Sequence, residues 1–107
     1  MIHNDTFREM ALSFPGTEEK PHFDRSAFKV TDRWIFATLH EKSRSANIRL
    51  SLDEQLIYCE YGKDRVYPVP NKWGEKGWTT FELDAVPVEL VLDALESAYN
   101  AARSDKK

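Results

Sequence analysis

The segment AFKVTDRWIFATL, residues 27–39, decides the fold class. Its two ends, AFKV and WIFATL, are rich in aromatic and β-branched residues, which favour extended strands. The three residues between them, Thr31, Asp32 and Arg33, are typical of a tight turn. The segment therefore predicts a β-hairpin, whose two strands must run antiparallel.

Three more strands are expected downstream of this hairpin. In ANIRLSL, residues 46–52, Ile48, Leu50 and Leu52 alternate with polar residues, as in a strand with one buried face. Residues 67–70 are extended, because their two prolines forbid a helix and limit pairing to a sheet edge or a strand end. In GWTTFEL, residues 77–83, we expect one face to carry Trp78, Thr80 and Glu82 and the other to carry Thr79, Phe81 and Leu83.

Helical periodicity marks three other segments. The first begins near Asn4 or Asp5 and ends at Pro15-Gly16. The second begins near Ser51 or Asp53, ends at Gly62, and is expected to turn Leu56, Ile57 and Cys59 inward. The third begins near Pro87 and presents an apolar stripe formed by Leu90, Val91, Ala94, Leu95, Ala98 and Tyr99.

The predicted order is α-β-β-β-α-β-β-α, which indicates a two-layer α+β domain with helices packed on an antiparallel sheet. The chain has 107 residues, of which 41% are hydrophobic, and we expect one domain over residues 1–107 with a frayed tail at residues 103–107. No apolar run reaches the roughly 20 residues that span a bilayer, and the first residues lack the features of a signal peptide. We therefore expect a cytoplasmic monomer that has no membrane partner.

Charge is unevenly distributed along the chain. Residues 29–49 contain five basic and two acidic residues, a net charge of +3, which leaves −6 for the rest of a chain whose total is −3. Nonspecific nucleic-acid binding depends on clustered Lys and Arg, so the total charge argues against a protein that simply coats nucleic acid. A locally basic face remains open, and its alternative is a solvated hairpin surface.

Enzyme and cofactor motifs are missing from the sequence. The glycines of GEKG do not form a phosphate-binding loop, and His3, His22 and His40 are not spaced as metal ligands. Cys59, the single cysteine, is expected to be a packed thiol. We therefore predict no cofactor, no metal and no catalytic residues, although a Ser-His-Asp arrangement stays open because such triads form in space.

The loop before the last strand is a candidate recognition element. Asn71, Lys72, Trp73 and Lys76 place an amide, an aromatic ring and two cations within a short span, and such groups can stack on bases and meet phosphates. The alternative is that the tryptophans serve the fold. We expect Trp78 to cover apolar sheet surface, whereas Trp73 could be buried or free.

Two long stretches resemble the MmcQ/YjbR family. They are ALSFPGTEEKPHFDRSAFKVTDRWIFATL, residues 11–39, and YPVPNKWGEKGWTTFELDAVPVELVLDALESAY, residues 67–99. The most specific parts are FPGTEE, with Pro15, Gly16, Glu18 and Glu19, the FKV strand at Phe28, and the element formed by Pro70, Trp73, Gly74, Gly77 and Trp78. The resemblance implies a small bacterial cytoplasmic domain with a CyaY-like or secretion-chaperone-like α+β fold. The family is commonly described as DNA-binding and brings no catalytic residue set.

Three functional hypotheses follow. The first is a nonenzymatic domain that binds DNA through the basic hairpin and the aromatic loop, with the candidate residues Lys29, Arg33, Lys42, Arg44, Arg49, Lys72, Trp73 and Lys76. The second is a protein-interaction or chaperone-like module that holds a protein or peptide and has no nucleic-acid role. The third is a small-molecule site or enzyme around Glu18, His22 and Trp73.

Overall fold

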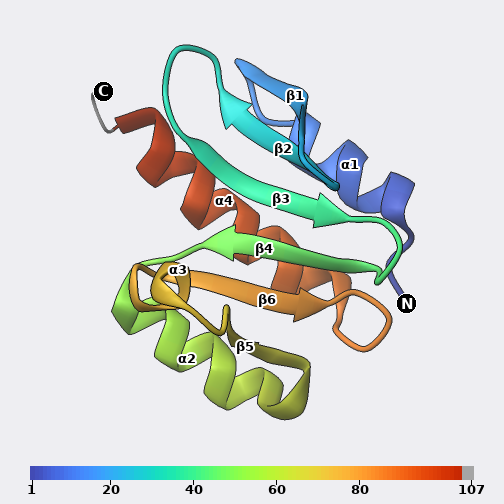
Figure 1. Cartoon of the computed structure of the whole chain (residues 1–107), viewed down its shortest axis with the longest axis vertical. Coiled ribbons are helices and arrows are strands. Elements are labelled where there is room, and N and C mark those ends of the chain that lie inside the picture. The colour runs from blue at the N-terminus through green and yellow to red at the C-terminus, as the bar shows by residue number, and fades with distance from the viewer. Residues whose placement is uncertain (105–107) are drawn as a thin grey trace.

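The computed structural model describes residues 1–104 and places six antiparallel strands in one sheet, in the order β1-β2-β3-β4-β6-β5 (Figure 1). The strands and helices, in chain order, are α1 Asn4–Leu12, β1 Thr17–His22, β2 Arg25–Val30, β3 Ile35–His40, β4 Ser45–Arg49, α2 Leu52–Gly62, the 3-10 turn η1 Lys63–Arg65, β5 Val66–Pro68, α3 Lys72–Glu75, β6 Trp78–Glu82 and α4 Val88–Ser104. The predicted α+β class is confirmed. No helix within these residues is long and apolar enough to cross a membrane.

Two elements are absent from the predicted order. β1 has the polar sequence TEEKPH and pairs along its whole length with β2, and its Glu19 forms an ion pair with Arg8 of α1 at 2.9 Å. An edge strand that is held by backbone pairing and an ion pair shows no apolar alternation. α3 is a single turn in which the Asn71 side chain accepts a hydrogen bond from the Trp73 amide at 2.8 Å. At the other end of the chain, residues 103 and 104 continue α4, and the predicted tail at 105–107 lies outside the described residues.

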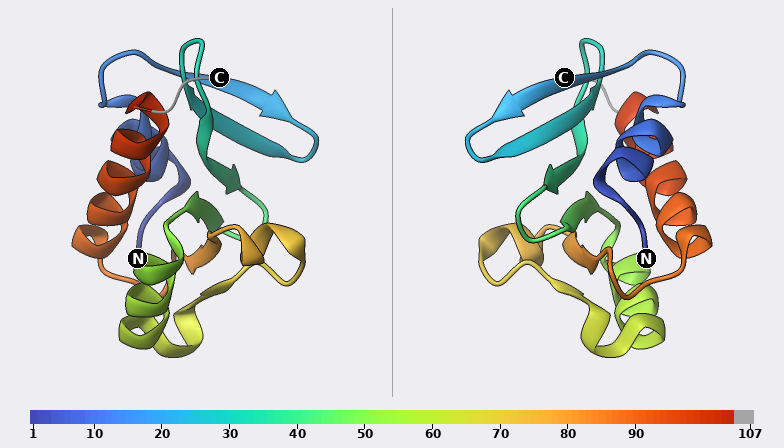
Figure 2. Two further views of the ribbon diagram at one scale, coloured as in Figure 1. Left: turned by 90° about the vertical axis from the view of Figure 1, so that its left-hand side faces the viewer. Right: turned by 90° about the vertical axis from the view of Figure 1, so that its right-hand side faces the viewer.

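One face of the sheet forms the core with α1 and α4 (Figure 2). Neighbouring strands contribute Phe28, Ala37, Ile48 and Thr79 to this face in register. Phe7 of α1 packs edge-on against Phe28, with ring centroids 5.8 Å apart. The predicted stripe of α4 faces the same core, because all its residues are buried except the partly buried Leu90.

The orientation of α2 differs from the prediction. Leu56 and Ile57 are 70% and 66% exposed, and the inward side of the helix carries Gln55, Tyr58 and Cys59. Gln55 can be buried because its side-chain amide donates to the Gly74 carbonyl at 2.9 Å and to the Thr79 hydroxyl at 3.1 Å. The sequence around Gln55 does not identify these two partners. The helix is therefore held by the hydrogen bonds of Gln55 and by the packing of Tyr58 and Cys59 on the core, while Leu56 and Ile57 face solvent.

Gly74 and Gly77 fit the chain closely around α3. A Cβ atom at Gly77, where φ is +102°, would lie 1.8 Å from the Leu50 carbonyl oxygen, and one at Gly74 would lie 1.9 Å from that of Val69. The Leu50 amide also donates to the Gly77 carbonyl at 2.9 Å. Only glycine allows this approach, which fixes the α3 segment beside the end of β4.

The opposite face of the sheet is not covered by α1 or α4. Figure 2 shows α3 and the bent β1–β2 hairpin projecting on this side, and Figure 1 looks onto it. We call it the open face. By register and alternation its central residues are Thr38, Asn47 and Thr80, followed in one direction by His40, Ser45 and Glu82 and in the other by Arg49 and Trp78.

Candidate nucleic-acid interface

Two cation–ring pairs lie at one end of the open face. The Arg49 guanidinium is 6.0 Å from the centre of the Trp34 ring, and the Lys76 ammonium is 5.4 Å from that of Trp73. The two tryptophans are 39% and 58% exposed. Arg49 and Lys76 also line one shared cavity of about 260 Å³ beside α4, so the two pairs are neighbours.

The antiparallel order of the strands explains this gathering. The start of β3 adjoins the end of β4, which brings Trp34 and Arg49 together. Lys29, near the end of β2, has Ile35 of β3 as its register partner and therefore lies at the same end. Because Gly77 pairs with Leu50, the loop that carries Lys76 is held directly beside Arg49.

We call this end of the open face the basic–aromatic surface. It is defined by Lys29, Arg33, Trp34, Arg49, Lys72, Trp73, Lys76 and Trp78. It includes six of the eight candidate residues from the sequence, and it adds two tryptophans. Trp78 is half-buried beside Arg49, whereas Trp73 is free enough to contact a ligand.

The other two candidate residues lie elsewhere. Lys42 and Arg44 belong to the turn between β3 and β4, at the opposite end of the hairpin from Arg49. Arg44 lies five positions before Arg49, which corresponds to roughly 17 Å along an extended strand. Arg44 also forms an ion pair with Asp84 at 3.4 Å. The five cations of residues 29–49 are thus divided between two ends of the sheet, and the predicted single hairpin face does not form.

Comparisons with known proteins agree with this fold. A family model described as YjbR matches residues 12–101. The chain belongs to the YjbR family. Among solved structures, the crystal structure of the Deinococcus radiodurans protein DR2400, of domain family DUF419, superimposes with a TM-score of 0.78 at 21% sequence identity. The alignment covers 92% of this YjbR chain and 76% of that protein, and it shows a shared fold. No curated protein matches the sequence.

Trp34 is the residue of the YjbR basic–aromatic surface that sequence reasoning missed. The sequence placed it inside a strand, whereas β3 begins one residue later, at Ile35. Asp32 has a φ of +62°, which turns the chain so that Trp34 lies under Arg49. The sequence did contain one signal that Trp34 could belong to the surface. Trp34 directly follows a turn, where strand alternation does not determine the direction of a large aromatic ring.

The proposed grouping of Glu18, His22 and Trp73 does not occur in this YjbR chain. Glu18 and His22 lie on β1, the first strand of the sheet, while Trp73 lies on α3 beside β6, the fifth. The His22 side chain is exposed. The pKa of Glu18 is lowered by a hydrogen bond from the Thr31 hydroxyl and then by Lys20. These residues form local surface contacts, and the structure gives no support to a site among them.

A hydrogen-bonded chain of Asp24, His40 and Ser43 lies at the far end of the open face. His40 Nε2 is 3.1 Å from Asp24, its Nδ1 is 2.7 Å from the Ser43 hydroxyl, and that hydroxyl is 2.7 Å from Ser45. These are the residue types of a hydrolase triad. However, the Asp24 side chain is 74% exposed, and neither the 260 Å³ cavity nor a second one of about 450 Å³ is lined by these residues. These hydrogen bonds link the β1–β2 turn to the β3–β4 turn.

Other polar groups of the YjbR open face are paired locally. The Thr80 hydroxyl donates to the Asn47 side-chain oxygen at 2.7 Å, and the Tyr67 hydroxyl donates to Glu82. The bond to Glu82 raises the pKa of Tyr67 to about 12, because the carboxylate favours the neutral phenol. Within residues 1–104, no three His, Cys, Asp or Glu side chains gather as metal ligands. Burial raises the pKa of the Cys59 thiol.

Proposed function

We propose that this YjbR-family chain is a nonenzymatic domain that binds nucleic acid through the basic–aromatic surface, with a preference for single-stranded DNA. The observation that carries the proposal is the pair of exposed tryptophan rings, each with a cation over it, where the two cations line the same cavity. Aromatic rings stack on unpaired bases, and the adjacent cations meet the phosphates.

The charge distribution supports weak and localised binding. Five of the eight residues of the surface are Lys or Arg, although the chain as a whole has a net charge of −3. Phosphate contacts release counterions, so the affinity should fall with increasing salt. The acidic remainder of the molecule repels a phosphate backbone, which confines the contact to this one end of the sheet.

The exposed rings favour a single strand over a duplex. Base faces are covered by their neighbours within a duplex, whereas an unpaired base can lie flat on Trp34 or Trp73. Each such stacking contact is worth about 1–3 kcal/mol. A duplex would meet only the cations of this surface, and we expect it to bind more weakly.

Two double variants test the proposal. Arg49→Gln/Lys76→Gln removes both cations from the ring pairs, and Lys42→Gln/Arg44→Gln removes the same charge from the other end of the sheet. Binding is measured by fluorescence anisotropy with a labelled oligothymidylate of about 12 nucleotides and with a duplex of similar length. The titrations are repeated at about 20 mM and about 150 mM salt.

We expect the first variant to lose about tenfold or more in affinity for the single strand at low salt. Its slope of log K against log salt should become shallower by about 1.4, because two phosphate contacts are removed. The control variant should change affinity by less than about twofold at about 150 mM salt, where the Debye length is about 8 Å and its more distant charges are screened. Equal losses in both variants would remove the assignment to this surface, and absence of binding by the unmodified chain at low salt would remove the function itself.

A further inference from the structure

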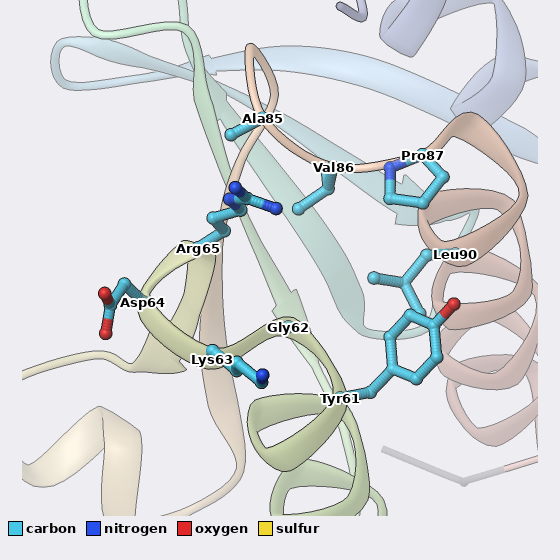
Figure 3. A pocket seen from close by; sticks show the side chains of 9 residues that line it. All are labelled: Tyr61, Gly62, Lys63, Asp64, Arg65, Ala85, Val86, Pro87 and Leu90. Carbon is cyan, nitrogen blue, oxygen red and sulfur yellow. The ribbon is translucent and has the colours of Figure 1, made fainter.

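The cavity of about 450 Å³ lies between the end of α2 and the start of α4 (Figure 3). The basic–aromatic surface lies near the other end of α2, whose 11 residues extend over about 16 Å. The residues used below are Tyr61, Lys63, Arg65, Val86, Pro87 and Leu90. A cavity of this size lies within the range of small-molecule sites, which is about 300–1,000 Å³.

One wall of the cavity is apolar. Val86 is buried with 4% exposure, and Pro87 and Leu90 continue the wall into the first turn of α4. Figure 3 shows the Tyr61 ring beside Leu90. This ring is 69% exposed, so it is available to cover an apolar group that enters.

The other wall is positively charged. Lys63 and Arg65 lie on η1, and neither forms an ion pair within the described part of the chain. Asp64, between them in sequence, also lines the cavity, and Figure 3 shows its side chain extending in the opposite direction to those of Lys63 and Arg65. These three side chains give the wall a net charge of +1, and the carboxylate forms no ion pair with either cation.

The backbone that presents these cations is tightly fixed. A Cβ atom at Gly62 would lie 2.2 Å from the Val66 Cγ2 atom, so a larger residue could not occupy this position without displacing β5. Lys63 follows with a φ of +52°, a left-handed conformation that is uncommon for a side chain of this size. This turn directs the chain from α2 into η1 and holds its cations beside the apolar wall.

We propose that this cavity binds a carboxylate joined to an apolar group. The carboxylate lies between Lys63 and Arg65, and the apolar group lies against Val86 and Leu90 beneath Tyr61. Such a ligand is either a free organic acid or the C-terminal residue of a polypeptide, because both present a carboxylate next to an apolar side chain. The site is independent of the nucleic-acid surface.

Helix α2 supplies a competing explanation for the two cations. Positive side chains near a helix C-terminus stabilise its dipole and need no ligand. That explanation predicts that removing both cations lowers the stability of the fold and leaves any weak binding in the cavity unchanged. The two explanations are therefore separated by measuring binding and stability on the same variant.

Binding is measured by two-dimensional NMR with 4-phenylbutyrate and with its neutral analogue 4-phenylbutanol. We expect the acid to shift the amide signals of Gly62, Lys63 and Leu90, and the alcohol to bind at least about tenfold more weakly. Equal binding of the acid and the alcohol, or absence of shifts at these residues at about 10 mM acid, would overturn the proposal.

The variant Lys63→Gln/Arg65→Gln should lose at least about tenfold in affinity for the acid, whereas Lys42→Gln/Arg44→Gln should bind it normally. Tyr61→Ala, at an exposed position, should weaken the acid and the alcohol alike. Unchanged acid binding by the Lys63/Arg65 variant would contradict the proposal, even if that variant were less stable.

A short peptide ending in Leu-Leu, compared as its free acid and its C-terminal amide, identifies the source of the ligand. If the free-acid peptide binds as tightly as 4-phenylbutyrate and the amide does not, the site accepts a polypeptide C-terminus. If only the small acid binds, the ligand is a free organic acid. Either result upholds the chemistry of the site.

Discussion

Thr38 shows how a single residue of the open face can lower the stability of the fold. It is 8% exposed, and its hydroxyl has no hydrogen-bond partner within residues 1–104. Replacing Thr38 with Val keeps the shape and removes the unpaired group, so we expect the free energy of unfolding to rise by about 1 kcal/mol. The measurement is urea denaturation followed by circular dichroism.

Thr80 provides the matched control for that prediction. It lies in the same row of the open face, but its hydroxyl donates to Asn47. Thr80→Val should therefore lower the free energy of unfolding by about 1 kcal/mol, because Asn47 loses its partner. Changes of the same sign in both variants would show that the hydrogen bonds do not determine the difference.

Trp73 gives the residue-scale test of single-strand binding. It is 58% exposed, so Trp73→Ala should leave the fold intact. We expect the affinity for oligothymidylate to fall by about 1–3 kcal/mol, and the affinity for a duplex to change much less. Trp73→Phe retains a stacking ring and should recover most of the loss. Anisotropy titrations check this order, and equal loss for single strand and duplex would argue against stacking.

At the scale of the element, α2 begins with a reciprocal pair of hydrogen bonds. The Ser51 hydroxyl accepts from the Glu54 amide at 3.1 Å, and the Glu54 carboxylate accepts from the Ser51 amide at 3.0 Å. Burial alone would raise the pKa of Glu54, but hydrogen bonds from Ser97 and Ser51 outweigh it and leave the pKa below its usual 4.5. A carboxylate with a lowered pKa stabilises the fold above its unfolded pKa, and this contribution disappears as the pH falls through the folded value.

The variant Glu54→Gln tests this effect. Gln retains the size of Glu and can still accept from Ser51, but its NH2 group replaces the oxygen that accepts from Ser97, so the substitution removes the charge together with that hydrogen bond. We expect the variant to be less stable than the unmodified chain at pH 7, and the difference to shrink as the pH falls below the usual carboxyl range. Urea denaturation at a series of pH values measures it, with the exposed Glu60→Gln on the same helix as the control. A difference that does not vary with pH would contradict this account.

The elements also show where the sequence was informative. α4 was predicted with its core stripe because apolar residues at helical spacing leave one buried face. The faces of β6 were predicted from simple alternation, and the register with β4 places Thr79 on the core face and Thr80 on the open face, although both are buried. α2 was turned the wrong way, because a buried Gln55 satisfies backbone and hydroxyl groups that the sequence does not identify as its partners. β1 was missed because its sequence, TEEKPH, has no apolar alternation, and only its backbone pairing with β2 marks it as a strand.

At the scale of the whole molecule, the sequence predicted which types of residue form the candidate site, but it did not predict how they are arranged in space. A basic segment and an aromatic loop were both visible in the sequence, and six of their eight residues meet at one end of the sheet. The separation of Lys42 and Arg44 follows from the length of β3 and β4, which places the middle of the basic segment at the opposite end of the sheet from its two ends, Lys29 and Arg49. The cavity beside η1 involves residues from 61 to 90, and only the folded chain brings them together.

The order of the strands limits the ways in which a partner can attach. β1 and β5 form the two edges of the sheet, where a peptide could otherwise add by backbone hydrogen bonding. β1 contains Pro21 between charged and polar residues, and β5 has only three residues, the last of which is Pro68. Proline offers no amide hydrogen and a short strand offers few pairs. Both edges of the sheet therefore disfavour the addition of a strand from a peptide or from a second copy of the domain, which leaves side chains as the groups available for recognition.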